Sequence, residues 1–300
     1  MKNSNLNHYL VLGAGVISVS FAAILIRLTE APAPVVAFYR LALAAVILAP
    51  ITWTKYRKEL EEVLNRKYLL PLTAGGFFLA AHFLFWITSL DYTTVASSVV
   101  FVSTQPIFVA LGAFLIFRRK TPAKIIFGIV IAILGSIIIG ASDLKITGNF
   151  FYGDMLALTG AVMIAAYYLI ASRLRKNLHL IPYVFVIYST TALFLLFYVL
   201  IGGYSLSTYG AKDFFIFLLL AVGPNVIGHT CLNWAIKYVS PSVVSASILG
   251  EPIGSTLLAV LILGEIPPAG TIIGGTVILC GIYITARADY RRKTKQLNID

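Results

Sequence analysis

Long apolar stretches occupy almost the whole chain, and they constrain its fold more than any other feature. A helix needs roughly 20 mostly apolar residues to cross about 30 Å of hydrocarbon. The sequence contains ten such stretches, at about residues 8–26, 33–53, 69–90, 95–117, 123–141, 150–172, 182–202, 213–236, 242–263 and 268–286. Because a backbone with no water partners favours helices, the chain is expected to be all-α, a polytopic membrane protein with ten transmembrane helices.

Composition excludes an ordinary soluble domain, because 59% of the 300 residues are hydrophobic and only 12% are charged. The first stretch is too long and too weakly basic at its start for a cleaved signal peptide. Both cysteines, Cys231 and Cys280, lie inside predicted helices and show no disulfide or metal spacing. We therefore expect neither a cofactor nor a metal site.

The net charge of +11 would suggest nucleic acid as the partner of a soluble protein, but here its placement indicates a membrane orientation. With a cytoplasmic N-terminus, most lysines and arginines fall on the inner side, in the connections 54–68, 118–124 and 173–176 and in the C-terminal tail. The outer side would hold Arg27, Lys145 and Lys212. The positive-inside rule therefore predicts an inner (cytoplasmic) membrane protein with both termini in the cytoplasm.

The chain repeats itself at an offset of 146 residues. Residues 92–139 align without a gap on residues 238–285, so that Pro106 pairs with Pro252. We expect two halves, 1–145 and 146–300. Because five helices per half is an odd number, equivalent helices should run in opposite directions, so that the halves are inverted. The charges agree, since the repeat equivalent of the basic 118–120 connection is Gly264-Glu265-Ile266, which carries no basic residue. Inverted repeats are typical of secondary transporters, whose substrate lies between the halves.

Glu251 is the acidic residue nearest the centre of a predicted helix, and Gln105 is its repeat partner. Each is followed by a proline, Pro252 or Pro106, which removes a backbone donor and breaks the helix locally. A carboxyl group at this depth can exchange a proton during transport. Alternatively it is structural, either protonated or paired with Arg40.

Arg40 follows Phe38 and Tyr39 in the second apolar stretch. Its guanidinium could bind an anionic group of a substrate through two parallel hydrogen bonds. The interpretation we favour is a structural lock, in which Arg40 ties its helix to a neighbour through backbone carbonyls or Glu251.

Two histidines, His82 and His229, lie one residue from repeat equivalence. Alone, each would be expected to make one interhelical hydrogen bond. Their near pairing instead favours a cavity, which they would line together with Asn225, Asn233, Trp86 and Trp234. Four glycines, Gly128, Gly135, Gly274 and Gly281, recur every seven residues within their helices and predict close helix packing rather than ligand contacts.

In this order, the motifs resemble the EamA-type branch of the drug/metabolite transporter superfamily. The resemblance rests on Phe38-Tyr39-Arg40, Leu90-Asp91-Tyr92-Thr93, Ile236-Lys237-Tyr238-Val239-Ser240, Glu251-Pro252, Leu263-Gly264-Glu265 and the four glycines. It implies a carrier whose cavity is lined by helices 1–4 and 6–9 and supported by helices 5 and 10, with amino acids, other metabolites or drugs as cargo, often exported. The chain departs from the family by Phe117-Arg118-Arg119 where Leu-Gly-Glu is common, and by the absence of a tryptophan in the first helix.

The function predicted from these features is secondary active transport of a small organic solute, with export as the expected direction. Its partners would be the solute, the lipid bilayer, protons as coupling ion and a second copy of the chain. A passive channel and a membrane-embedded enzyme are the alternatives. Because the aspartates are scattered at helix ends and tails, an enzyme is the weaker of the two.

Overall fold

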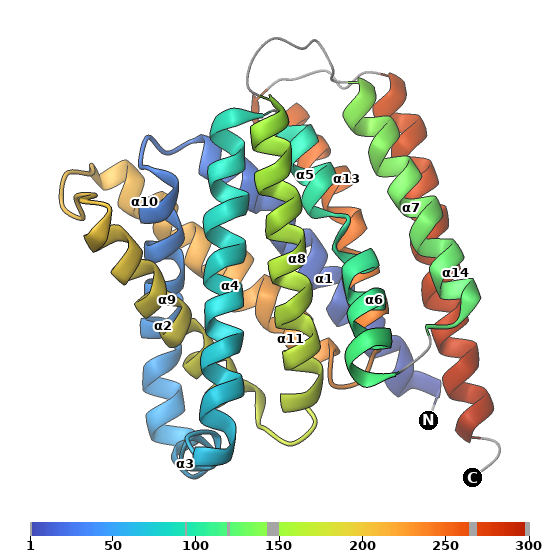
Figure 1. The fold of residues 1–300 in the computed structure, drawn as a ribbon, viewed down its shortest axis with the longest axis horizontal. Coiled ribbons are helices and arrows are strands. Elements are labelled where there is room, and N and C mark those ends of the chain that lie inside the picture. Colours follow the sequence, from blue (N-terminus) through green and yellow to red (C-terminus); the bar gives the residue numbers. More distant parts are fainter. Residues whose placement is uncertain (1, 94, 119–120, 143–149, 264–268, 298–300) are drawn as a thin grey trace.

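The computed structural model describes residues 2–93, 95–118, 121–142, 150–263 and 269–297, and within these ranges all regular structure is helical (Figure 1). The unbroken long helices are α1 (Lys2–Arg27), α2 (Ala33–Lys55), α4 (Arg66–Tyr92), α7 (Ala123–Ser142), α8 (Phe150–Leu174), α9 (Leu180–Ile201) and α14 (Ala269–Leu297). A short helix, α3 (Arg57–Val63), connects α2 to α4.

Three further helical paths are interrupted. The first consists of α5 (Val95–Val102) and α6 (Gln105–Phe117). The second consists of α10 (Ala211–Leu220), the π-helical η1 (Ala221–His229) and α11 (Thr230–Ala235). The third consists of α12 (Pro241–Ser247), the 3-10 turn η2 (Ile248–Gly250), α13 (Glu251–Leu258) and the π-helical η3 (Ala259–Leu263).

Among the residues that the structure describes, seven helical segments are long and apolar enough to cross a membrane: Asn7–Arg27, Ala33–Lys55, Arg66–Tyr92, Phe151–Leu174, Leu180–Ile201, Ala211–Ala235 and Pro241–Ile262. Three shorter apolar helices there are Gln105–Ile116, Ala123–Gly135 and Ile272–Thr285. Each of these segments overlaps one of the apolar stretches predicted from the sequence. The structure thus confirms an all-helical protein with several membrane-spanning helices, while the full number of ten spans stays a prediction.

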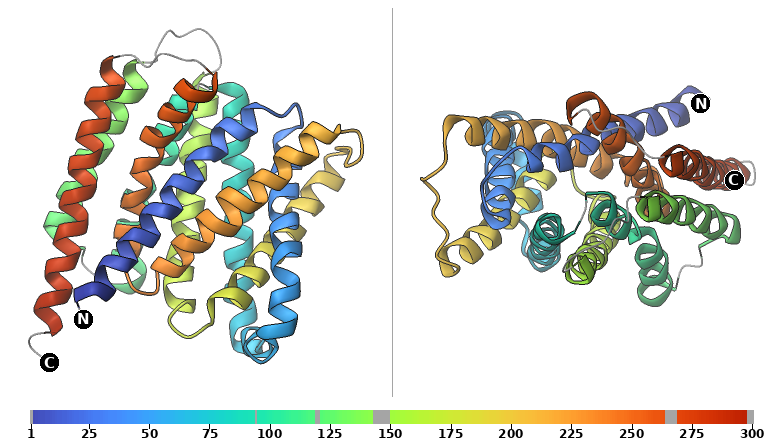
Figure 2. Two further views of the ribbon diagram at one scale, coloured as in Figure 1. Left: turned by 180° about the vertical axis from the view of Figure 1, so that it is seen from behind. Right: turned by 90° about the horizontal axis from the view of Figure 1, so that it is seen from above.

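Helices of the first half pack on helices of the second half in equivalent pairs. Helix α4 lies against α8, and the repeat-equivalent contact is made by α1 against η1 and α11 (Figures 1 and 2). Helix α2 packs on its own equivalent, α9. The core therefore lies between the halves.

The glycines of α7 and α14 pack these two helices backbone to backbone. A Cβ atom added to Gly128 would lie 2.7 Å from the Gly281 carbonyl oxygen, and one added to Gly135 would lie 2.6 Å from the Gly274 carbonyl oxygen. Because Gly128 is the repeat equivalent of Gly274 and Gly135 that of Gly281, each contact is the image of the other, as a two-fold axis between antiparallel helices requires. The predicted packing role of these glycines is confirmed.

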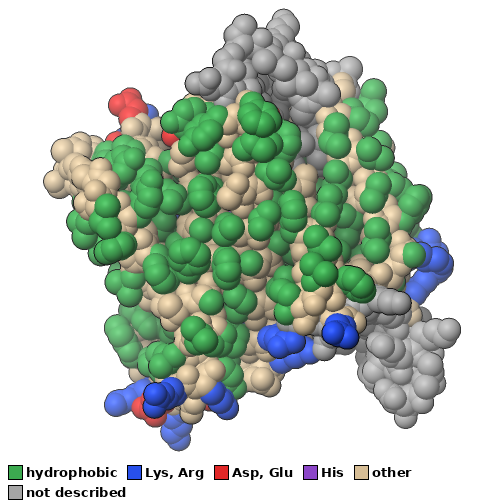
Figure 3. Space-filling model, viewed as in Figure 1, with side chains coloured by type: hydrophobic (Ala, Val, Ile, Leu, Met, Phe, Trp, Pro, Cys, Tyr) green, Lys and Arg blue, Asp and Glu red, His purple; other side chains and the backbone are tan. Residues whose placement is uncertain are grey.

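The surface of the protein suits a bilayer. Large apolar side chains are exposed on many helices, among them Leu70 and Leu261 at 80% and Ile201 at 71%. Figure 3 shows apolar side chains across the face of the molecule and blue Lys and Arg side chains along its lower edge, the end at which both termini lie in Figure 1. Of the residues used to predict orientation, Arg119, Lys120, Lys145 and the 264–266 connection lie outside the described residues.

Candidate functional site

Two helix interruptions bring Gln105 and Glu251 to the centre of the molecule. Helix α5 ends at Val102 and α6 begins at Gln105, with Pro106 in its first turn. In the second half, the 3-10 turn η2 precedes α13, which begins at Glu251. Proline is tolerated in a first helical turn because the amide hydrogens there have no partner within the helix. Both Gln105 and Glu251 are buried.

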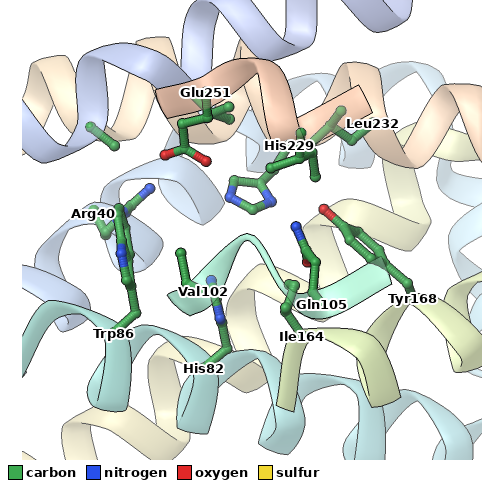
Figure 4. A pocket seen from close by; sticks show the side chains of 13 residues that line it. Arg40, His82, Trp86, Val102, Gln105, Ile164, Tyr168, His229, Leu232 and Glu251 are labelled. Atoms are coloured by element: carbon green, nitrogen blue, oxygen red, sulfur yellow. The ribbon is translucent and has the colours of Figure 1, made fainter. Parts of the chain in front are cut away.

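A pocket lies between these two interruptions, with about 410 Å³ of space that atoms do not fill, part of it open to the outside. In Figure 4, Glu251 and His229 project into it from one wall, and Gln105, His82 and Trp86 project from the other. The full lining consists of Val19, Ala22, Arg40, His82, Trp86, Val102, Gln105, Ile164, Tyr168, His229, Leu232, Ile248 and Glu251. Six of the nine site and lining candidates named from the sequence therefore line one pocket.

The pocket lining follows the repeat. Of its 13 residues, eight form four pairs separated by 146 positions: Ala22 with Tyr168, Trp86 with Leu232, Val102 with Ile248, and Gln105 with Glu251. Two more pairs are displaced by one position, Val19 with Ile164 and His82 with His229. Arg40 has no counterpart, because its equivalent Val186 is not part of the lining. Equivalent positions of the two halves thus line the pocket, but they carry different side chains.

Arg40 is held by an amide side chain rather than by carbonyls or Glu251. Its Nε and Nη2 atoms donate to Asn225 Oδ1 at 3.0 and 2.6 Å, and Asn225 Nδ2 donates to the Arg40 carbonyl at 3.3 Å. The guanidinium carbon lies 4.2 Å from the centre of the Phe83 ring. Arg40 thus locks α2 to η1, and it forms no ion pair with Glu251 in the described part of the chain.

The two histidines differ in their contacts. His82 Nδ1 is hydrogen-bonded to the Gly160 carbonyl of α8 at 3.0 Å, so it makes the interhelical bond expected of a single histidine while also lining the pocket. His229 packs its ring edge-on against Phe83. The His82 ring is stacked in parallel with Trp86. This wall of the pocket therefore combines flat apolar faces with polar edges.

Five polar side-chain atoms of the lining are buried and, among the described residues, have no hydrogen-bond partner. They are Arg40 Nη1, Trp86 Nε1, Gln105 Oε1, the Tyr168 hydroxyl and His229 Nδ1. Buried polar atoms in proteins are nearly always satisfied by protein, water or ligand. Their concentration around one pocket indicates a site that contacts a polar solute or water.

Three candidates from the sequence, Asn225, Asn233 and Trp234, do not line the pocket. Asn225 is held by Arg40. Asn233 lies one turn beyond His229 on nearly the same helix face, and there its Oδ1 accepts a hydrogen bond from the Tyr167 hydroxyl at 2.7 Å while its Nδ2 donates to the His229 carbonyl at 2.8 Å. Trp234 packs against His8 and Tyr238 at the end of α11.

Tyr168 is the polar lining residue that sequence reasoning missed. It is fully buried in α8, and it occupies the repeat position of Ala22. Since tyrosine is common in membrane helices, composition alone could not distinguish Tyr168 from the other tyrosines of the chain, which has 16 in all. The repeat pairs Tyr168 with Ala22 of the first helix, but this pairing points to the site only after the pocket is known. Within the described residues, no three His, Cys, Asp or Glu side chains are grouped to hold a metal ion.

The chain matches the model of the EamA-like transporter family twice, over residues 7–141 and 151–287. An uncharacterized transporter of Archaeoglobus fulgidus is 26% identical over 285 residues, which cover 91% of this chain and 94% of that protein. The uncharacterized transporter YdfC of Bacillus subtilis is 26% identical over 213 residues, covering 69% of this chain and 68% of that protein.

A solved crystal structure has the same fold, with a TM-score of 0.77 over 95% of this chain and 98% of that chain, at 17% identity. The resemblance inferred from the motifs is confirmed: the chain belongs to the EamA-like transporter family and is a multi-pass membrane transporter.

Proposed function

We propose that the protein is a secondary active transporter that moves a small organic solute across the inner membrane by alternating access, with export as its direction. The observation that carries this proposal is the pocket whose lining residues pair at the repeat offset. A site built from equivalent positions of two halves lies on the axis between them, where secondary transporters with inverted repeats bind their substrates.

The proposal includes ten membrane-spanning helices in two inverted halves, 1–145 and 146–300, with both termini in the cytoplasm. The reciprocal glycine contacts between α7 and α14 support inversion, because two-fold-related equivalents run antiparallel there. The lysines and arginines that gather at the end of the molecule near both termini support the orientation (Figure 3). We also propose that two copies of the chain form a homodimer.

The chemistry of the pocket favours a solute that has both polar and apolar parts. Arg40 Nη1, Trp86 Nε1 and the Tyr168 hydroxyl can donate hydrogen bonds, and Gln105 Oε1 can accept one. The ring faces of Trp86 and His82 and the side chains of Ile164 and Leu232 supply apolar walls. Glu251 is the one acidic residue of the lining. We propose it as the group that exchanges a proton with the solute or with the driving gradient.

A ligand screen tests binding in this pocket. Purified protein in detergent is heated with amino acids, nucleosides, sugars or common drugs, and its unfolding temperature is recorded. A solute that binds only the folded state raises that temperature, because it stabilises the protein by RT ln(1 + c/Kd), where c is its free concentration. The increase should be lost in Gln105→Ala and retained in Glu59→Gln, because Glu59 lies in α3, remote from the pocket.

A flux assay then decides the mechanism. Solutes identified in the screen are loaded into proteoliposomes, and their movement is followed with and without unlabelled solute on the opposite side. A carrier saturates and is accelerated by solute on the opposite side. Flux that rises without limit and shows no exchange would instead identify a passive channel, and conversion of the solute would identify an enzyme.

A further inference from the structure

Where α4 ends and α8 begins, five residues join the two helices at one end of the pocket. The Thr93 hydroxyl donates to Asp154 Oδ1 at 2.9 Å, and the Tyr92 and Tyr152 rings meet edge to face, 5.0 Å between centres. Gly153 is so close that an added Cβ would lie 2.8 Å from Thr93 Cβ and 2.9 Å from the Thr93 amide nitrogen. These residues, Tyr92, Thr93, Tyr152, Gly153 and Asp154, are called the Asp154 latch.

A second contact joins α1 to the end of α11. The His8 ring is stacked on the Tyr238 ring with 4.5 Å between centres and 5° between planes. The Trp234 ring lies 5.3 Å from the His8 ring and 4.8 Å from the Tyr238 ring. These three residues, His8, Trp234 and Tyr238, are called the His8 latch.

The two latches occupy equivalent positions of the repeat. Adding 146 to His8 gives Asp154, and adding 146 to Tyr92 gives Tyr238. They lie at opposite ends of the molecule, since α8 begins at the upper end in Figure 1 and the N-terminus of α1 lies at the lower end. The shared repeat position thus carries Asp154, which accepts a hydrogen bond from Thr93 at one end, and His8, which stacks on Tyr238 at the other.

Each latch lies just beyond the pocket on helices that line it. Trp86 lines the pocket seven residues before Thr93, and Leu232 lines it six residues before Tyr238. At a rise of 1.5 Å per residue, each latch is roughly 10 Å from the lining along its helix. Separating α4 from α8, or α1 from α11, would therefore open the pocket toward one side only.

We infer that the Asp154 latch and the His8 latch are the two gates of the transport pathway. This inference rests on the proposed alternating access, in which the pocket opens to one side at a time. Both contacts are formed in the structure, and each proposed opening breaks only one of them. Because the gates differ in chemistry, substitutions can open each one separately.

The test measures access to the pocket and needs no solute. Ala22, a small residue of the lining, is changed to cysteine after the native cysteines are removed by Cys231→Ala and Cys280→Ser. Reaction with a membrane-impermeant thiol reagent is followed in right-side-out and inside-out vesicles. The side near α8's first turn is called the Asp154 side, and the side near α1's first turns is called the His8 side.

The chain supplies matched variants for the Asp154 latch. Gly153→Ala places a Cβ against the Thr93 backbone, and Thr93→Val removes the hydroxyl with little change of shape. Val162→Ala is the control, because Val162 lies on the same helix, is 38% exposed and does not line the pocket. For the His8 latch, His8→Ala removes the stack and His8→Phe keeps an aromatic ring in place.

We expect Gly153→Ala and Thr93→Val to raise the labelling rate several-fold from the Asp154 side alone. His8→Ala should raise it from the His8 side alone, and Val162→Ala and His8→Phe should match the parent. Equal changes on both sides, or no change with either latch variant, would overturn the inference. A failure to find any transported solute would count against the proposed function but would leave this side-specific labelling unaffected.

Discussion

Arg40 and Asn225 hold each other through three hydrogen bonds, although 185 positions separate them in the chain. Both side chains are fully buried. The contact uses the Nε and Nη2 atoms of the guanidinium. The third nitrogen, Nη1, is buried and has no partner among the described residues, and the Arg40 side chain lines the pocket. Arg40 thus combines the two interpretations that the sequence left open, a lock between helices and a polar group in the site.

Replacing Asn225 should show what the lock contributes. Asn225→Leu leaves a buried guanidinium without its acceptor, and hydrogen bonds to charged groups contribute about 1.5–3 kcal/mol. We expect a clearly lower unfolding temperature in detergent, followed by circular dichroism. Asn225→Asp keeps an acceptor of the same shape and should stay close to the parent protein. Equal destabilisation by both variants would show that the amide donor to the Arg40 carbonyl, not the guanidinium contact, matters most.

Removing the Tyr168 hydroxyl should separate binding from stability. The hydroxyl is buried without a partner among the described residues, so Tyr168→Phe should leave the unfolding temperature unchanged or raise it. Solute-induced stabilisation should nevertheless weaken, because the pocket loses a donor. Tyr188→Phe is the contrast. The Tyr188 hydroxyl donates to the Asn225 carbonyl at 3.1 Å, so its removal should lower the unfolding temperature. The prediction is wrong if Tyr168→Phe destabilises the protein as much as Tyr188→Phe.

Glu251→Gln should uncouple transport from protons. The amide has nearly the shape of the acid but exchanges no proton, and the equivalent position already carries a glutamine, Gln105. In proteoliposomes, we expect the variant to lose stimulation by a pH gradient while it still exchanges solute for solute. Glu59→Gln, in the short helix α3, serves as the control for removal of one carboxylate. Unchanged stimulation in Glu251→Gln would exclude this residue as the coupling group.

Adding one methyl group to the contact between α7 and α14 should destabilise the protein. In Gly281→Ala the new Cβ would lie 2.5 Å from the Ala132 amide nitrogen and 2.6 Å from the Gly128 carbonyl oxygen, both backbone atoms. Overpacking of this kind costs about 1–3 kcal/mol. Gly275→Ala on the same helix is the matched control, because its nearest neighbour, Ile253, would be 3.6 Å away. Thermal unfolding of the two purified variants should therefore differ, and equal values would contradict this description of the interface.

Several features could be predicted from the sequence because they depend on composition and local pattern. Apolar stretches of the length that lipid demands predicted the helices, and the spacing of Gly128 and Gly135 predicted a close helix contact. Prolines 106 and 252 predicted interruptions where α6 and α13 now begin. Each of these features belongs to a single helix or to a regular spacing within it, so residues that are near in the sequence are enough to predict it.

The composition of the site could be predicted only in part. Glu251, Gln105 and the two histidines were found because polar side chains are rare at such depth. Asn233 looked equally suitable, but it lies one helical turn beyond His229, where it meets Tyr167 rather than the pocket. Tyr168 carried no signal, since a tyrosine in a membrane helix is ordinary. Which face of a helix meets the pocket depends on packing, and the sequence pattern of a helix that is apolar all round does not specify that face.

By itself, the sequence determined that the chain is helical, crosses a membrane several times and contains two copies of one unit, because hydrophobicity and duplication are written along the chain. The tertiary structure alone decided that six of the predicted residues share one pocket, that Asn225 holds Arg40, and that His8 and Asp154 take equivalent places at opposite ends. The physical reason is that these relationships join residues far apart in the chain, and their distances are set by how whole helices pack across the interface of the two halves.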